Sequence, residues 1–300
     1  MKFVTAKRQG TSFVGVLSAQ NEVVHLQMAE QAMGEESTLP HSLMECIALG
    51  DAFVDKVQEI VTWSEKQRAV DYVYPLESVQ LLAPIPRPLK NIFCVGKNYV
   101  DHALELGSAD DIPKHLMLFS KAPTTVIGHE SLVLRHAHVT EELDYEGELA
   151  VVIGKKGKGI KEEEALDYVF GYTIINDITA RDLQQRHKQF LLGKSLDTSC
   201  PMGPWIVHKS LIPNPNRLHI ETKVNGEIRQ KANTEQFIFP VETIISTISQ
   251  GMTLEPGDII ATGTPAGVGK GMKPPRFLQS GDIVEITIEK IGTLRNRIGE

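Results

Sequence analysis

Two glutamates one residue apart stand at the start of an apolar segment, in LDYEGELAVVIG. If this segment is a strand, Glu146 and Glu148 point to the same face, because strand side chains alternate with a period of two. The residues that follow are apolar, so the strand is expected to enter the core. Two like charges there are costly unless a positive charge lies between them. A divalent cation supplies that charge; a solvated strand end is the alternative that needs no ligand.

A third carboxylate follows another apolar segment, in YTIINDITARDLQ. The pattern predicts a strand that ends at Asp177 and a helix that begins at once. Asp177, Arg181 and Gln184 then lie at i, i+4 and i+7 on one helical face. Arg181 can hold a substrate carboxylate through two hydrogen bonds. The alternatives are that Asp177 caps the helix and that Arg181 forms an i,i+4 salt bridge with it.

Glu146, Glu148 and Asp177 together form a candidate all-oxygen metal site, since no Cys or His ligand pattern accompanies them. Oxygen ligands favour Mg²⁺, Mn²⁺ or Ca²⁺ over Zn²⁺ or Cu²⁺. Three protein ligands on an octahedral ion leave about three positions for substrate and water. An open coordination sphere of this kind indicates catalysis rather than structural support.

Three further polar residues are candidates for the chemistry. His102 and Glu105 are neighbours on one helical turn in GKNYVDHALELG, where the carboxylate can orient a general base, although such pairs are also common on surface helices. Lys194 follows an apolar run in FLLGKSLDTSCPMGPW. If it is buried beside a metal, it can stabilise an enolate or deliver a proton; the alternative is a solvated lysine that flanks the core.

The glycine-rich segment ATGTPAGVGKG is a candidate binding loop. Its spacing does not match the phosphate motif G-x-x-x-x-G-K-[ST], so we reject nucleotide binding there. The Thr264 hydroxyl and the backbone N–H groups of such a loop can still bind a carboxylate.

These residues need a β-rich scaffold, and the sequence predicts an α+β fold with two domains. Residues 89–300 contain short apolar runs separated by Gly, Pro, Asn and Asp, as in a β-rich domain. Residues 1–88 are expected to form a small α+β domain, and the proline-rich segment at 83–90 a linker. The expected strands are 1–6, 11–19 and 21–26. The expected helices are 42–50, 52–67 with Asp51 as its cap, 162–168, 179–189 and 241–250. A hairpin is expected at Asn225–Gly226.

Composition excludes several classes of protein. The net charge of −7 indicates no basic face for nucleic acid. The three cysteines are odd in number and scattered, so they indicate neither a zinc site nor a disulfide framework, and a reducing cytoplasm is expected. The first residues lack the apolar segment of a signal peptide, and no apolar run approaches the roughly 18 residues of a membrane span.

Taken together, the segments resemble the fumarylacetoacetate hydrolase family. The matching strings run in family order over about residues 91–299, and their combination is much more specific than any one of them. They are GKNYVDHALE, FSKAPT, LDYEGELAVVIGK, GYTIINDITARDLQ, GKSLDTSCPMGPW, VNGEIRQ and ATGTPAGVGKG.

The resemblance implies a mixed β-roll fold, a homodimer and a role for each candidate residue. It implies that Mg²⁺ or Mn²⁺ is bound by the three carboxylates and that the His–Glu pair activates water. It assigns enolate stabilisation to Lys194. It assigns substrate contact to Arg181, Gln184 and Thr264.

The substrate implied by the resemblance is a small 2-oxo acid that chelates the metal through its 2-oxo group and C1 carboxylate. Oxaloacetate decarboxylation is the preferred reaction. Acylpyruvate or fumarylpyruvate hydrolysis, or a related isomerase or hydratase step, is the alternative, because family membership does not fix the substrate. A metal-bound 2-oxo-acid sensor or scaffold is the alternative that is not an enzyme.

Overall fold

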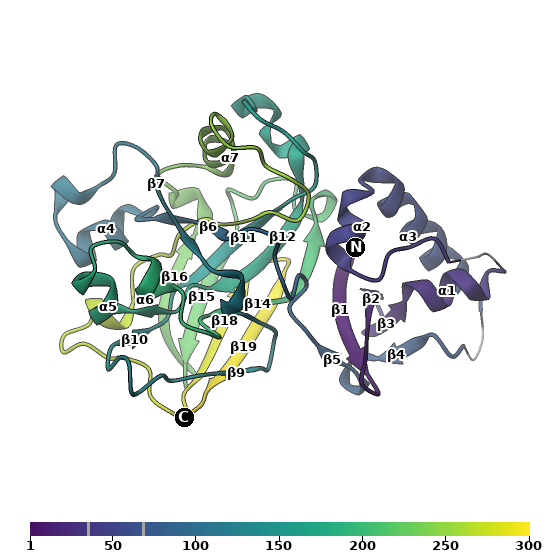
Figure 1. The fold of residues 1–300 in the computed structure, drawn as a ribbon, viewed down its shortest axis with the longest axis horizontal. Coiled ribbons are helices and arrows are strands. Elements are labelled where there is room, and N and C mark those ends of the chain that lie inside the picture. Colours follow the sequence, from purple (N-terminus) through teal and green to yellow (C-terminus); the bar gives the residue numbers. More distant parts are fainter. Residues whose placement is uncertain (35–36, 68–69) are drawn as a thin grey trace.

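The computed structural model describes residues 1–34, 37–67 and 70–300 and shows an α+β fold with three sheets (Figure 1). The strands are β1 Lys2–Arg8, β2 Thr11–Leu17, β3 Glu22–His25, β4 Val73–Pro75, β5 Gln80–Leu81, β6 Ile92–Gly96, β7 Met117–Lys121, β8 Val126–Ile127, β9 Leu132–Val133, β10 Leu143–Asp144, β11 Gly147–Ile153, β12 Val169–Asn176, β13 Thr179–Ala180, β14 Cys200–His208, β15 His219–Val224, β16 Glu227–Asn233, β17 Ile259–Ala261, β18 Ile283–Ile288 and β19 Gly292–Ile298.

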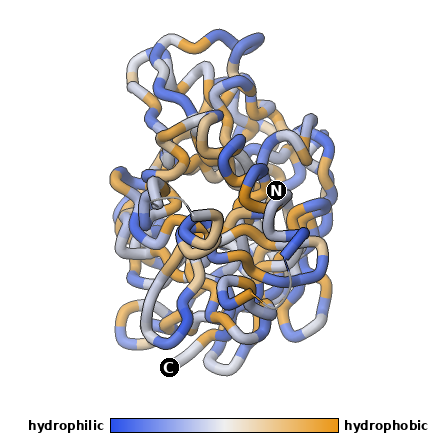
Figure 2. The backbone as a smooth tube through the Cα atoms, turned by 90° about the vertical axis from the view of Figure 1, so that its right-hand side faces the viewer, coloured by the Kyte–Doolittle hydropathy of each residue, from blue (hydrophilic) through white to orange (hydrophobic). Residues whose placement is uncertain are grey.

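The α-helices are short, apart from one in the N-terminal part. They are α1 Leu26–Ala32, α2 Leu43–Ala48, α3 Asp51–Ser64, α4 Val100–Leu106, α5 Arg181–Arg186, α6 Leu191–Lys194 and α7 Val241–Ser249. None of the helices in the described ranges is long and apolar enough to cross a membrane. Figure 2 shows hydrophobic and hydrophilic stretches interspersed along the chain.

The N-terminal part confirms the predicted strands and helices, with two corrections. β1 and β2 form a hairpin around Gln9 and Gly10, both at positive φ. Helix α3 buries Phe53, Val57 and Ile60 on one face, as its helical spacing predicts. Its cap position is Gly50, not the expected Asp51. Helix α1 was not predicted, because its seven residues are too few for a clear period.

One large sheet runs through both predicted domains. Its strand order is β4-β3-β2-β1-β14-β12-β11-β17-β6-β7, and β1 pairs with β14 through Lys2–Val207 and Phe3–Ile206. The proline-rich segment 83–90 forms no helix or strand, as its composition predicts. The division at residue 88 stays a prediction, since hydrogen bonds and packing cross it.

Strand β11 separates two hydrophobic layers. Leu149 and Val151 pack with the five-stranded sheet, whose order is β16-β15-β18-β19-β9. Ala150 and Val152 face the opposite way, toward a cluster that includes Phe3 and the N-terminal helices. Both faces of the strand are therefore buried, which explains its unbroken apolar sequence.

The remaining expected elements are confirmed in part. Strands β15 and β16 flank the predicted Asn225–Gly226 turn, and α7 lies within the expected 241–250. Residues Glu162–Tyr168 form a 3₁₀ rather than an α-helix. The helix expected over 179–189 is shorter: Thr179–Ala180 pairs with β10, and the helix begins only at Arg181.

Candidate active site

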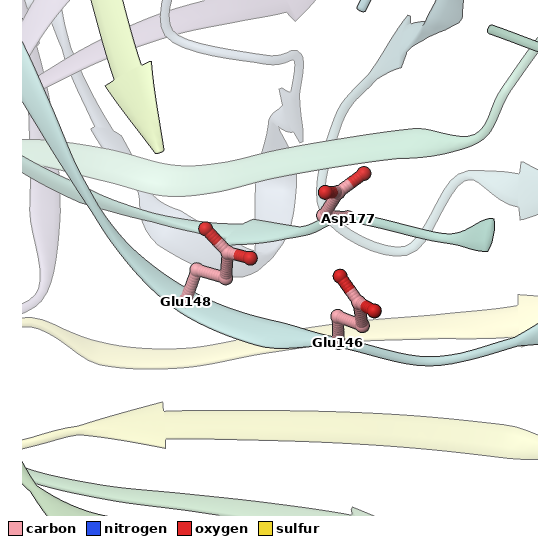
Figure 3. A group of neighbouring side chains, drawn as sticks. All are labelled: Glu146, Glu148 and Asp177. Carbon is pink, nitrogen blue, oxygen red and sulfur yellow. The ribbon is translucent and has the colours of Figure 1, made fainter. Parts of the chain in front are cut away.

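Glu146, Glu148 and Asp177 meet in one buried cluster (Figure 3). Each offers a carboxylate oxygen, and these oxygens lie within 4.8 Å of one another. The three residues are 4%, 1% and 0% exposed. The solvated strand end considered as the alternative for the two glutamates is therefore wrong.

The pairing of β11 with β12 produces this convergence. Gly147 is opposite Asn176 in the ladder, and the Asp177 N–H donates to the Glu146 carbonyl oxygen at 2.8 Å. A Cβ at Gly147 would meet Thr222 of the five-stranded sheet, so the neighbouring glutamates point to the other face. The period-two prediction is confirmed.

Three cations surround two of the carboxylates. Lys194 Nζ lies 2.7 Å from both Glu146 Oε2 and Asp177 Oδ2. Lys121 Nζ lies 2.8 Å from Asp177 Oδ1, and Arg181 Nη2 lies 2.7 Å from Glu146 Oε1. Burial alone raises the pKa of Glu146, but Lys194 and Arg181 hold it at about 2. Glu146 is thus a carboxylate at neutral pH.

Glu148 lacks such a partner. Its carboxylate accepts a hydrogen bond from the Gly263 N–H at 2.7 Å and makes no ion pair with any of the described residues. Burial, with the charges of Asp177 and Glu146, raises the pKa of Glu148 well above its ordinary value. A buried, uncompensated carboxylate next to two others fits a hard divalent cation, which prefers oxygen ligands.

Arg181 is held by a residue that the sequence reasoning did not select. Its Nε lies 2.9 Å from Asp144 Oδ2, and its Nη1 donates to Gln184 Oε1 at 3.3 Å. Because the helix begins after Asp177, the predicted helical face shared by Asp177, Arg181 and Gln184 is wrong. The two alternatives, a cap by Asp177 and an i,i+4 salt bridge, are wrong as well, because the cap position of α5 is Ala180.

His102 and Glu105 lie on α4, with His102 Nδ1 3.4 Å from Glu105 Oε2. Glu105 Oε1 also accepts a hydrogen bond from the Gly267 N–H at 2.9 Å. His102 is buried, so the pair is not the surface feature considered as the alternative. The carboxylate fixes the imidazole ring, as a general base requires.

Lys194 and Thr264 are both buried. The solvated-lysine alternative is therefore wrong. The Thr264 hydroxyl donates to the Gly147 carbonyl oxygen at 3.0 Å and accepts a hydrogen bond from Gln230 Nε2 at 2.7 Å. Thr264 is thereby held beside the glutamate strand, and its contact with substrate stays a prediction.

Most of the predicted site residues line one cavity of about 460 Å³. Its lining includes His102, Glu146, Glu148, Arg181, Gln184, Lys194 and Thr264. The sequence reasoning missed the lysines that line it and the buried residues that brace it. They are Lys97, Lys188 and Lys270 at the cavity, and Lys121, Asp144 and Gln230 behind it. The signal that could have found Lys121, Asp144 and Gln230 was the family resemblance, because all three lie within the matching strings.

Comparison with known proteins decides the family. The profile described as "Fumarylacetoacetate (FAA) hydrolase C-terminal" matches residues 91–299. The chain belongs to the fumarylacetoacetate hydrolase family. The resemblance inferred from the motifs is thereby confirmed, and so is the expectation of an enzyme, at the level of the family.

Relatives in the family match the chain over its whole length. Oxaloacetate tautomerase YisK of Bacillus subtilis is 57% identical, with 100% of both chains covered. A fumarylacetoacetate hydrolase from Exiguobacterium antarcticum is 42% identical, with a TM-score of 0.81 and coverage of 100% of this chain and 99% of the other.

A third relative bears on the metal. The maleylpyruvate hydrolase from Sphingobium sp. SYK-6, solved in complex with manganese(II) ion and pyruvate, is 27% identical, with a TM-score of 0.78 and coverage of 100% and 99%. A divalent metal is thus bound within the family, and this chain has a buried acidic triad to match.

Proposed function

We propose that the chain is a Mg²⁺- or Mn²⁺-dependent enzyme that interconverts the keto and enol forms of oxaloacetate. The observation that carries the proposal is the buried triad of Glu146, Glu148 and Asp177, which shares one cavity with His102, Lys194 and Arg181. The name of the relative YisK, at 57% identity, supports oxaloacetate as the substrate. The pyruvate in the maleylpyruvate hydrolase complex supports a 2-oxo acid more generally.

A bound divalent ion supplies Lewis acidity, which stabilises negative charge on a 2-oxo group. The protein must then move one proton from C3 to the enol oxygen. His102, oriented by Glu105, is the proposed base at C3. Lys194 lies beside the carboxylates and is the proposed group that balances the developing enolate charge. Arg181, Gln184 and Thr264 are the proposed contacts to the substrate.

We also propose that the same site can cleave a carbon–carbon bond. Decarboxylation of oxaloacetate passes through the same kind of enolate as tautomerisation and needs no water, so we keep it as a second activity. Hydrolysis of an acylpyruvate instead requires water to attack the distal carbonyl. In that reaction His102 and Glu105 activate the water.

The test follows three signals in parallel: the absorbance of enol oxaloacetate, pyruvate released from oxaloacetate, and pyruvate released from acetylpyruvate. Each is measured with Mg²⁺, Mn²⁺ or EDTA, and decay caused by metal alone is subtracted. Metal-dependent loss of the enol without pyruvate supports a tautomerase. Pyruvate from oxaloacetate adds decarboxylation, whereas turnover of acetylpyruvate alone overturns the proposal in favour of hydrolysis.

We further propose that the enzyme is a cytoplasmic homodimer. The exposed Leu191 and Leu192, 49% and 55% exposed on a helix at the site, are suited to an interface. Light scattering coupled to size exclusion tests the dimer. A sensor or scaffold role is the competing function, and a His102→Asn variant that loses turnover but keeps every cellular effect favours it.

A further inference from the structure

Another cavity, of about 410 Å³, is lined in part by Tyr145, the residue that precedes Glu146. Its polar lining combines two arginines and one aspartate with neutral hydrogen-bonding groups. These residues are Tyr145, Asn225, Arg229, Arg276, Gln279 and Asp282. Such a combination suits a small oxyanion.

Arg229 is the unusual member of this lining. Its side chain is only 6% exposed, yet its Nε is buried and donates no hydrogen bond to any of the described residues. Its Nη1 donates to Met272 Sδ at 2.9 Å, and a thioether is a weak acceptor. A buried guanidinium normally has strong acceptors for its donors, so Arg229 is incompletely satisfied.

Arg229 and Arg276 share one ion-pair partner among the described residues. Glu227 Oε2 lies 3.1 Å from Arg229 Nη2, but Glu227 Oε1 lies 2.9 Å from Arg276 Nη1, so one half-exposed carboxylate serves both cations. Asp282 also lines the cavity. Its oxygens accept hydrogen bonds from the Asn225 side chain and the Gln279 N–H.

We propose that this cavity binds a small oxyanion, a carboxylate or a phosphate group, with Arg229 and Arg276 as its cationic partners. Guanidinium groups match both kinds of anion through paired hydrogen bonds. Asn225 and Gln279 supply neutral polar contacts at the same cavity. The anion gives the two guanidinium groups an acceptor in addition to the Glu227 carboxylate that they share.

We further infer that an anion in this cavity regulates the enzyme, and this part of the inference rests on the proposed function. Contacts through Tyr145 and Gly267 link the cavity to the active site. The Tyr145 hydroxyl lies beside Arg229 and donates to the Gly267 carbonyl oxygen at 2.8 Å. The Gly267 N–H in turn holds Glu105. A Cβ at Gly267 would collide with the Arg229 carbonyl oxygen, so the two segments are in close contact. An anion at Arg229 therefore acts on the loop that positions the His102–Glu105 pair.

The binding test is calorimetry with inorganic phosphate and, separately, succinate, both with EDTA present. It compares the wild type with Arg229→Met, Arg276→Met and the matched control Arg297→Met, which changes an exposed arginine outside the cavity. We expect the wild type and control to bind at least one probe, and each cavity variant to bind it at least tenfold more weakly. The probe that binds distinguishes phosphate from carboxylate ligands.

Binding that is unchanged in Arg276→Met, or no binding of either probe to the wild type, overturns the site. Arg276 is half exposed, so this variant decides the matter even if Arg229→Met does not fold. The regulatory part is tested by turnover of oxaloacetate at constant free Mg²⁺, with and without the bound probe. We expect at least a twofold change that Arg276→Met abolishes. Equal turnover overturns the regulatory part, and the binding result stands independently of the proposed function.

Discussion

At the scale of single residues, neighbouring cations explain how two glutamates and an aspartate can be buried together. Lys194, Lys121 and Arg181 compensate two of them, and Glu148 is left for an ion. Alternation along a strand was enough to predict that the glutamates share a face. It could not predict the three cations, because they come from segments far apart in the chain.

The ligand assignment predicts the effect of Glu146→Gln. Removing one anionic ligand should weaken Mn²⁺ binding by at least tenfold, because affinity at oxygen sites depends on the number of ligand charges. Calorimetry with Mn²⁺ measures it, and Glu163→Gln, an exposed change on the 3₁₀ segment, is the control. Unchanged affinity in Glu146→Gln would remove this residue from the set of ligands.

At the scale of elements, the site depends on short helices packed without space between them. A Cβ at Gly193 of α6 would lie 2.6 Å from the Gln184 backbone nitrogen and 2.8 Å from the Ala180 carbonyl oxygen. This close approach places Lys194, the next residue, against the carboxylates. The sequence predicted α5 but not its first residue, because Thr179 and Ala180 pair with β10 and are not helical.

Gly193→Ala is therefore expected to destabilise the protein by about 1–3 kcal/mol, the usual cost of overpacking. Urea unfolding measures the loss. Gly251→Ala, where a Cβ meets no atom of the described residues within 4 Å, is the matched control and should differ little from the wild type. Equal stability of the two variants would show that α5 and α6 are not tightly packed.

The end of α1 supplies a pH-dependent element. Buried Glu30 accepts hydrogen bonds from the Ser37 hydroxyl, the Thr38 hydroxyl and backbone, and the Leu39 N–H. Burial alone would raise the pKa of Glu30, but these bonds hold it below the ordinary value of 4.5. The stabilisation is therefore complete above pH 4.5 and is lost as the pH falls through the lower folded value.

Glu30→Gln should thus cost about 1–3 kcal/mol at pH 7, since hydrogen bonds to a charged acceptor are lost. The difference between variant and wild type should narrow as the pH falls below 4.5. Urea unfolding at pH 7 and at a series of acidic values measures it. A difference that grows on acidification would contradict the assigned sign.

At the scale of the whole molecule, the two predicted domains share one sheet and one hydrophobic cluster. The Phe3 ring lies 5.1 Å from that of Phe53 in α3 and 5.1 Å from that of Phe170 in β12. The proline-rich segment 83–90 was expected to be a linker, and it forms no helix or strand. It could not reveal the β1–β14 pairing, because long-range strand pairing leaves no local pattern in the sequence.

Shared packing predicts a single unfolding transition. Trp63 lies in α3 and Trp205 in β14, so fluorescence of variants that keep one tryptophan reports each part separately. Phe3→Ala should lower stability by about 3–5 kcal/mol in both signals. Leu89→Ala, at a side chain that is 80% exposed, should change little. Two separate midpoints would show that the parts unfold independently.

The measurement that tests the central claim most directly is the rate at which enol oxaloacetate disappears, followed for the wild type and Glu148→Gln with Mg²⁺, Mn²⁺ or EDTA. The account predicts fast, metal-dependent conversion by the wild type, with EDTA and Glu148→Gln each reducing the rate by at least a hundredfold. A wild-type rate in EDTA or in Glu148→Gln would contradict the claim that a metal at this triad carries the chemistry.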